Sequence, residues 1–345
     1  MVKRLLSCQA SEVLAMNGQE LKQAILASEG RTVVTETTVM ASPLYGNITT
    51  AEIASAFGSD MILLNGFDCF NPHIPALPET DDPIKLLREL SGRPIGANLE
   101  PVDDSVEMMS EKVEIAEGRK ATAETFRAAE KLGLQFICLT GNPGTGVTNK
   151  MIAKAIKVCK ENFTGLIIAG KMHAAGVDEP VVDIPTIKEF IEAGADVILM
   201  PAAGTVPGLQ ESEITEACKV IKAAGCLSLT AIGTSQETSD VETIRQLALS
   251  SKRSGVDIQH IGDAGWGGLA NPENIMAMSV AIRGIRHTYF KMCQSAKRKY
   301  TNKRNGKGSY YIFLIYNLQF FSSIKSGNFL LKSCLYVKPQ LSSSF

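Results

Sequence analysis

Five side chains that could do chemistry follow short apolar segments of the chain. They are Glu36, Glu100, Lys171, His173 and Asp263. A charged group at such a place loses hydration unless it is paired or used. An ion pair such as Glu36–Lys171 or Glu100–Lys171 would satisfy two of these groups. Three carboxylates, a lysine and a histidine exceed that structural need, so we predict that the set is catalytic.

Two chemistries fit this set, and the sequence leaves both open. Lys171, flanked by carboxylates, would form a Schiff base with a carbonyl substrate or transfer protons. Alternatively, a divalent cation such as Mg²⁺ or Mn²⁺ would polarise a carbonyl or enolate oxygen. Its candidate ligands are Glu36, Glu100, His173 and Asp263. Activity of a Lys171→Met variant that persists and depends on metal would exclude the Schiff base.

Uncharged polar and glycine-rich segments accompany the charged set and are predicted to bind substrate. The polar members are Asn65, Asn98, Thr140 and Asn142, and the loop members are Gly204, Thr205, Gly233, Thr234, Ser235, Gly265, Trp266, Gly267 and Gly268. Backbone N–H groups of late glycine-rich loops often hold a substrate phosphate in barrel enzymes. Asp263 would repel a phosphate, so we expect it to face the reacting centre.

A nucleotide cofactor is not expected. The segment 141–148 resembles a phosphate-binding loop, but Val147 stands where that motif needs lysine. The segment after the first predicted strand lacks the GxGxxG pattern of an open dinucleotide-binding sheet.

The elements that must position these residues repeat about every 30 residues. Apolar strands are predicted to begin near Thr32, Met61, Pro94, Gln135, Leu166, Val197, Leu227 and Ile258. Each interval has room for one strand and one return helix. Eight such units predict an α/β fold, a (β/α)8 TIM barrel, in which active sites lie at the carboxyl ends of the strands. An N-terminal helix from Asn17 to about Ser28 precedes the barrel, and a helix from Asn271 to about Lys297 closes it.

Alternation of side chains along each strand predicts which residues point into the barrel. The predicted inward set is Val34, Glu36, Leu63, Asn65, Gly96, Asn98, Glu100, Cys138, Thr140, Ile167, Ala169, Lys171, His173, Ser228 and Thr230. The polar members gather at the carboxyl ends.

Charge and composition divide the chain. Residues 1–273 carry 23 Lys and Arg against 36 Asp and Glu, whereas residues 274–345 carry 12 basic and no acidic residues. The acidic body argues against a nucleic-acid surface. We predict a barrel at 1–298 and an appended, disordered or loosely packed tail at 299–345, and we expect a chain cut after about Lys299 to fold.

Scattered cysteines without a CxxC pair indicate a reduced, cytoplasmic protein. The apolar run at 310–321 is short for a membrane span, so no membrane partner is expected for the barrel. A homo-oligomer is compatible with the sequence.

Three stretches, TGNPGTGVTN at 140–149, GKMHAAGVDEP at 170–180 and GDAGWGG at 262–268, together with RHTY at 286–289, resemble a bacterial family of TIM-barrel proteins of unknown function. The resemblance covers about residues 1–298. Some members carry a haloacid dehalogenase-like hydrolase label, but the DxDx[TV] motif of that chemistry is absent from this sequence. The wider resemblance is to phosphate-binding barrels that act on sugar phosphates.

These observations predict a lyase or isomerase that acts on a small phosphorylated carbonyl metabolite, such as a sugar phosphate. The alternative is a regulatory barrel that binds a metabolite without turning it over. Mutual ion pairs that lock Lys171 and the carboxylates would favour this alternative.

Overall fold

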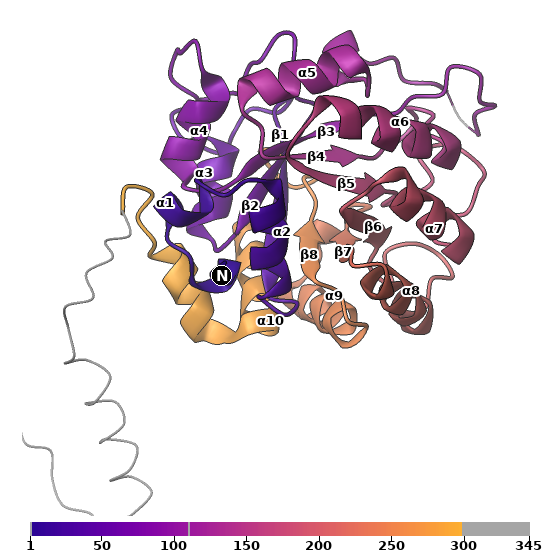
Figure 1. The fold of residues 1–345 in the computed structure, drawn as a ribbon. Helices are drawn as coiled ribbons and strands as arrows, with labels where there is room; N and C mark the ends of the chain where they lie inside the picture. The colour runs from indigo at the N-terminus through magenta and orange to yellow at the C-terminus, as the bar shows by residue number, and fades with distance from the viewer. Residues whose placement is uncertain (1, 110, 299–345) are drawn as a thin grey trace, which may run out of the picture. The chain divides into compact units, whose positions relative to one another are not determined.

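Eight parallel strands close into a barrel, which confirms the (β/α)8 prediction (Figure 1). The computed structural model describes residues 2–109 and 111–298, so the predicted tail lies outside the described residues. Each strand pairs with its sequence neighbours, and the first pairs with the last. The strands are β1 (Thr32–Thr38), β2 (Met61–Asn65), β3 (Ile95–Leu99), β4 (Phe136–Leu139), β5 (Leu166–Gly170), β6 (Val197–Pro201), β7 (Leu227–Ile232) and β8 (Ile258–Ile261).

Helices surround the barrel in chain order (Figure 1). They are α1 (Ala10–Val13), α2 (Gly18–Leu26), α3 (Thr50–Ala56), α4 (Pro83–Ser91), α5 (Ala123–Leu132), α6 (Asn149–Asn162), α7 (Ile184–Ala193), α8 (Glu211–Ala223), α9 (Val241–Arg253) and α10 (Pro272–Met292). Short 3-10 helices are η1 (Leu5–Ser7), η2 (Glu117–Arg119) and η3 (Gln236–Thr238). Within the described residues, no helix is long and apolar enough to cross a membrane.

Local signals set several helix ends. Asn17 with Glu20 and Thr49 with Glu52 form the capping boxes of α2 and α3. At α9 the N-cap is Asp240, whose side chain accepts the Thr243 N–H. The last helix ends earlier than predicted, at Met292.

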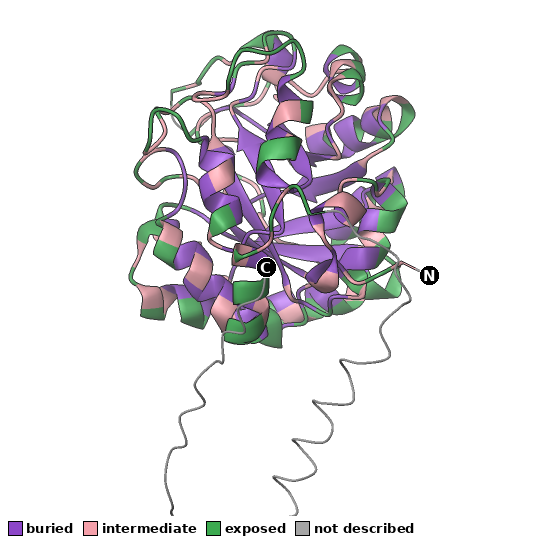
Figure 2. Cartoon of the chain, turned by 90° about the vertical axis from the view of Figure 1, so that its left-hand side faces the viewer, coloured by how far each residue is buried: buried purple, intermediate pink, exposed green. Residues whose placement is uncertain are grey.

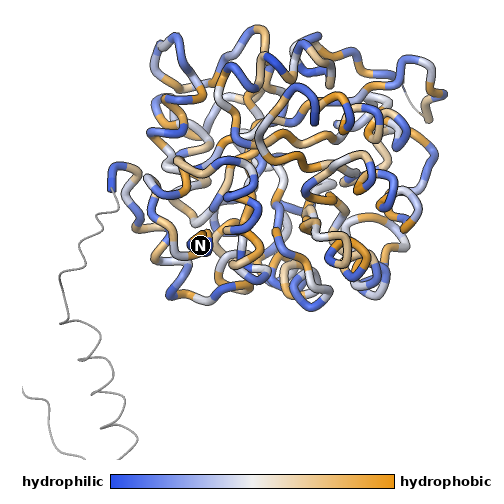
Figure 3. The backbone as a smooth tube through the Cα atoms, in the orientation of Figure 1, coloured by the Kyte–Doolittle hydropathy of each residue, from blue (hydrophilic) through white to orange (hydrophobic). Residues whose placement is uncertain are grey.

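The apolar core has two layers on either side of the strands. Inside the barrel lie Val34, Leu63, Cys138 and Ile168 with α2 residues, whereas Val33, Ile62 and Ile167 pack outward against helices. Figure 2 shows the buried strands at the centre and exposed positions on the outer helices. Figure 3 shows hydrophobic stretches along the central part of the barrel and hydrophilic positions along the outer helices. The predicted facings of the first four strands are therefore confirmed.

The predicted facings of β5 and β7 are wrong. Leu166 and Ile168 point into the barrel on β5, and Leu227, Leu229 and Ala231 do so on β7. Ile167 and Ala169 instead pack toward the helices, and the Ser228 hydroxyl lies 3.1 Å from the Asp257 carboxylate. The β5 sequence LIIAG is apolar throughout and carries no clear alternation, as is usual for a strand buried on both faces. The β7 sequence LSLTAI does alternate, but its apolar positions face the barrel interior.

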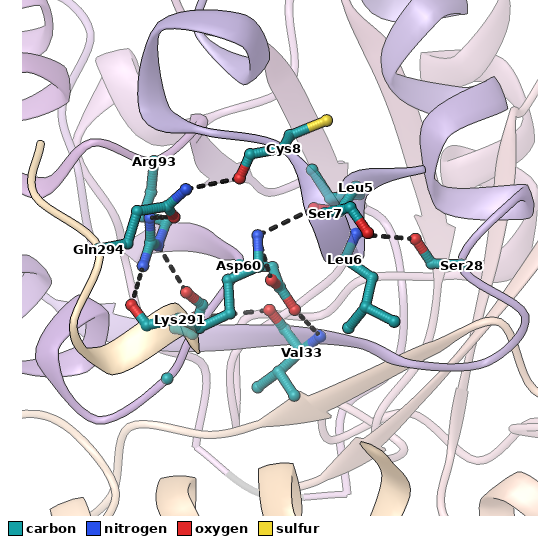
Figure 4. A network of polar contacts seen from close by, with 12 residues as sticks. Leu5, Leu6, Ser7, Cys8, Ser28, Val33, Asp60, Arg93, Lys291 and Gln294 are labelled. Atoms are coloured by element: carbon teal, nitrogen blue, oxygen red, sulfur yellow. Dashed lines mark hydrogen bonds and ion pairs between the residues drawn. The ribbon is translucent and has the colours of Figure 1, made fainter. Parts of the chain in front are cut away.

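A buried ionic network ties the N-terminal segment to α10 at the opposite end of the barrel from the predicted site (Figure 4). Asp60 lies 2.5 Å from Arg283 and 3.1 Å from Lys291. Lys291 also donates to the Leu5 carbonyl, and Arg93 donates to the Lys291 carbonyl. This network is part of the scaffold.

Candidate active site

A cavity of about 420 Å³ lies at the carboxyl ends of the strands, where barrel chemistry is expected. Ten of the residues singled out in the sequence line it. They are Glu36, Asn65, Asn98, Thr140, Asn142, His173, Gly233, Thr234, Ser235 and Asp263. Others do not line it, namely Glu100, Lys171, Gly204, Thr205, Gly265, Trp266, Gly267 and Gly268. The structure thus brings together most of the polar set and excludes the predicted lysine.

Glu36 is the most perturbed carboxyl group of the cavity. Burial, followed by the neighbouring Glu237 and Glu100 carboxylates, raises the pKa of Glu36 to about 8. At neutral pH this side chain therefore holds its proton and can act as an acid.

His260, on β8, lies beside Glu36 inside the barrel. Its Nε2 is 3.2 Å from the Glu36 carboxyl, although neither ring nitrogen makes a hydrogen bond within the described residues. Burial lowers the pKa of His260 to about 4. The contact therefore joins two neutral groups at pH 7.

Asp263 follows β8 and is the second perturbed carboxyl group. Burial and the Glu36 carboxyl raise the pKa of Asp263 to about 7, whereas a hydrogen bond of 3.0 Å from Asn65 Nδ2 opposes the rise. Near neutral pH a substantial fraction of Asp263 is ionised, so it can accept a proton.

Glu237, on η3, is a third carboxyl group in the cavity and was missed by the sequence reasoning. Burial raises its pKa, and the Asp263 charge adds to that effect. One of its oxygens accepts the Ala264 N–H at 3.0 Å. It links the loop after β7 to the loop after β8.

A layer of amide side chains connects the strand ends on the other side of the cavity. Asn65 and Asn142 exchange two hydrogen bonds of 2.9 and 3.0 Å. Asn98 Nδ2 donates to Asn65 at 3.4 Å, but the Asn98 Oδ1 and Thr140 Oγ1 atoms have no partner among the described residues. Buried polar atoms without partners are costly, so we expect a ligand or an ordered water molecule to satisfy these two.

Glu100 holds this amide layer in place from behind. Its two oxygens accept the Asn142 backbone N–H and side-chain N–H, each at 2.8 Å. Arg119 donates to the same carboxylate at 2.8 Å. Glu100 is only 1% exposed, and its bonds commit it to positioning Asn142.

Lys171 is turned away from the cavity, which corrects the inward orientation predicted for it. It forms an ion pair with Glu179 rather than with Glu36 or Glu100. Burial lowers the pKa of Lys171, and the Glu179 hydrogen bond opposes that shift. Glu179 also accepts the Asn149 N–H at 2.6 Å, so the pair anchors the start of α6.

His173, two residues further on, does reach the cavity. Its Nδ1 accepts the Ala175 N–H at 2.9 Å, which places the proton of the neutral ring on Nε2. Burial and the nearby Lys171 charge lower the pKa of His173. It is thus a neutral hydrogen-bond donor for a substrate oxygen.

The glycine-rich loops divide in two. The loop at Gly233, Thr234 and Ser235 lines the cavity, and its two non-glycine residues take left-handed φ values of 57° and 68°. The segment 265–268 instead packs on the chain after β1, where Thr38 N–H donates to the Gly268 carbonyl at 2.9 Å. Trp266 is 86% exposed and does not wall the cavity.

The charge of the lining limits what can bind. Among the described residues no lysine or arginine lines this cavity, whereas three carboxyl groups do. No group of three or more His, Cys, Asp or Glu side chains in the described ranges could hold a metal ion. The Mg²⁺ or Mn²⁺ ligand set predicted at Glu36, Glu100, His173 and Asp263 therefore does not fit a preformed metal site.

The architecture and this cavity define a (β/α)8 barrel with an acidic pocket at the carboxyl ends of its strands. Residues 6–298 match the Domain of unknown function (DUF7916), and the chain belongs to that family. This agrees with the resemblance of the sequence to a barrel family of unknown function. No curated protein sequence matches the chain.

Three solved structures with a similar course of the chain are compared by their identity to this sequence, the coverage of both chains and the TM-score. 2,3-Dimethylmalate lyase, a PEP mutase/isocitrate lyase superfamily member, is 12% identical, with 94% of this chain and 99% of that chain covered and a TM-score of 0.46. An archaeal fructose 1,6-bisphosphate aldolase is 14% identical, with 74% and 95% covered and a TM-score of 0.47. Oxaloacetate acetylhydrolase, in complex with 3,3-difluorooxalacetate, is 14% identical, with 92% and 97% covered and a TM-score of 0.45.

Proposed function

We propose that this protein is an enzyme of the lyase or isomerase class that transfers protons next to the carbonyl group of a small polar substrate. One observation carries the proposal. Two carboxyl groups of the same buried cavity have pKa values of about 8 and about 7, at Glu36 and Asp263. A protonated acid and a partly ionised base that share a cavity are what enolisation at neutral pH requires.

The residues have separate roles in this proposal. Asp263 removes the proton from the carbon beside the carbonyl group, and Glu36 protonates the carbonyl oxygen. His173 donates Nε2–H to a substrate oxygen, while Asn98 Oδ1 and Thr140 Oγ1 bind substrate hydroxyl groups. Glu100 acts through Asn142 and is a positioning residue.

Proton transfer is proposed in preference to a Schiff base or a metal-bound enolate. Lys171 lies outside the cavity lining and is paired with Glu179. Both oxygens of Glu100 are engaged by Asn142 and Arg119. The proposed proton transfer therefore uses neither an imine nor a bound cation.

A phosphorylated substrate is a narrower part of the proposal. Without a lysine or arginine in the described lining, a phosphate would depend on backbone N–H groups of Gly233, Thr234 and Ser235. Inorganic phosphate that competes with a phosphorylated substrate but not with its unphosphorylated counterpart would support it.

Deuterium exchange tests the central proposal. Dihydroxyacetone, glyceraldehyde and dihydroxyacetone phosphate would be incubated with the enzyme in D₂O, and loss of the α-proton followed by NMR. We expect exchange with at least one compound and a loss of about 10²–10⁴-fold in Asp263→Asn. The exposed Asp178 lies outside the cavity, so Asp178→Asn serves as the matched control.

The alternative, a regulatory barrel, is favoured by one observation. Two of the five predicted catalytic residues are held in ion pairs, Lys171 with Glu179 and Glu100 with Arg119. Compounds that bind without any α-proton exchange would select this alternative and overturn the enzymatic proposal.

A further inference from the structure

A second cavity, of about 500 Å³, adjoins the acidic one. His173, Ala174 and Thr234 line both cavities. The second cavity lies between the loop after β5 and the loop after β6. A molecule bound at the carboxyl groups therefore needs only to extend past His173 to enter it.

Aliphatic side chains form one wall of the second cavity, namely Val181, Val182, Val206 and Leu209. His173, Thr205, Thr234 and the acidic Glu213 are also in its lining. Val182 and Leu209 also pack against the large apolar core, so this wall is backed by fixed structure.

Two hydroxyl groups in the lining of the second cavity are already satisfied by the protein. Thr205 Oγ1 donates to the Ala202 carbonyl at 2.7 Å, and Thr234 Oγ1 donates to the Thr205 carbonyl at 2.8 Å. In the acidic cavity, by contrast, Asn98 Oδ1 and Thr140 Oγ1 have no partners in the described part of the chain. This difference favours a polar group in the acidic cavity and an apolar group against the aliphatic wall beside it.

We propose that the second cavity binds an apolar branch of the substrate, so that the ligand is a carbonyl compound with a polar head and an alkyl chain of several carbons. The head lies at Glu36 and Asp263, and the chain passes His173 to reach Val182, Val206 and Leu209. This inference rests on the proposed carbonyl substrate, but it is tested through binding rather than turnover.

Chain length is the variable that tests it. Dissociation constants would be measured by calorimetry for 1-hydroxy-2-alkanones from hydroxyacetone to 1-hydroxy-2-octanone. Burial of each added methylene predicts a Kd about fourfold lower per carbon until the cavity is filled. An affinity that is the same for every member, or no binding by any member, would overturn the proposal.

Substitutions in the lining test whether the increase in affinity with chain length arises in this cavity. Val206 is half-buried in a loop, so Val206→Trp should fill the cavity and abolish the gain with chain length, while the Kd of hydroxyacetone changes less than twofold. Val206→Ser is the milder second variant, expected to weaken the octanone several-fold. Ile285, 53% exposed on α10, provides Ile285→Trp as the control. A chain-length gain that survives Val206→Trp contradicts the assignment.

Deuterium exchange separates this inference from the proposed function. Long-chain members that bind tightly without α-proton exchange leave the apolar cavity in place and contradict only the enzymatic proposal. Exchange of hydroxyacetone without any gain from chain length contradicts only the apolar cavity.

Discussion

Glu36 and Asp263 derive their proposed chemistry from what surrounds each carboxyl group. Both are buried beside other carboxyl groups, and no lysine or arginine lines the described cavity. Desolvation and like charges act in the same direction and raise both pKa values. By contrast, the paired carboxylate of Asp60 has a lowered pKa, because Arg283 and Lys291 outweigh its burial.

The pH dependence of exchange follows from these two groups. Activity should rise as Asp263 loses its proton near pH 7 and fall as Glu36 loses its proton near pH 8. A bell-shaped rate profile with its maximum between these values is expected. In Glu36→Gln the alkaline limb should disappear and the rate at neutral pH should fall at least tenfold. A wild-type rate that rises steadily to pH 10 would contradict these roles.

Stability should also depend on Glu36. Its pKa in the folded protein, about 8, exceeds the ordinary value of 4.5, so between these values the folded state binds more protons than the unfolded state. Stability therefore falls as pH rises through this window. The Glu36→Gln variant has no titrating group at this position. As pH rises, its free energy of unfolding minus that of the wild type should therefore increase by up to about 1.4 kcal/mol per pH unit.

Urea unfolding at pH 5, 6, 7 and 8 measures this difference. Glu89→Gln is the control, since Glu89 is exposed on α4 and its replacement should change stability by less than about 0.5 kcal/mol. A constant difference between wild type and Glu36→Gln would contradict the burial of a protonated Glu36.

Individual elements position the site through close packing inside the barrel. Gly96 on β3 leaves room for the Phe136 ring, and an added Cβ would lie 2.3 Å from that ring. Phe136 is fully buried among the inward residues. It lies below the strand ends that carry Asn98 and Thr140, so the floor of the cavity depends on this pair.

Gly96→Ala should therefore be strongly destabilising. The Phe136 ring is fully buried, and overpacking of this kind costs about 1–3 kcal/mol. Gly46→Ala is the matched control, because an added Cβ there meets nothing within 4 Å. Thermal unfolding compares the two, and equal melting temperatures would contradict the proposed packing.

Sequence patterns predicted the facing of some elements and not of others. Glu36 and Asn98 lie within strands that have polar or small residues at alternate positions, so their inward orientation could be inferred. The β5 sequence is apolar on both faces, and Lys171 was placed inward although it points outward to Glu179. Its partner lies eight residues away in a loop, a contact that no strand pattern indicates.

At the scale of the whole molecule, contacts join the N-terminal segment to α10 at the end of the barrel opposite the cavity. Asp60 receives Arg283 and Lys291 from α10, and Lys291 binds the carbonyl of Leu5. Figure 4 shows Leu5, Asp60 and Lys291 converging from segments far apart in the sequence. The prediction that a chain cut after about Lys299 folds as a barrel remains to be tested.

Loss of Asp60 should destabilise the whole barrel. Asp60→Asn leaves Arg283 and Lys291 buried without their counter-charge, which costs about 3–5 kcal/mol. The exposed pair of Arg127 and Glu124 offers Glu124→Gln as the control, with a much smaller expected change, since exposed ion pairs contribute little to stability. Urea midpoints measure both, and similar values for the two variants would contradict the structural role of the network.

The sequence by itself determined the eightfold alternation of strands and helices and, through it, the end of the barrel where Glu36, Asn65, Asn98 and Asp263 meet. This alternation depends on residues that are near one another in the sequence, so the sequence alone reveals it. Only the tertiary structure decided that Glu237 lines this cavity, that His260 lies beside Glu36, that Lys171 is paired outside the cavity, and that a second cavity with an aliphatic wall adjoins it. These properties depend on burial and on distances between residues remote in sequence, and those same quantities set the protonation of Glu36 and Asp263.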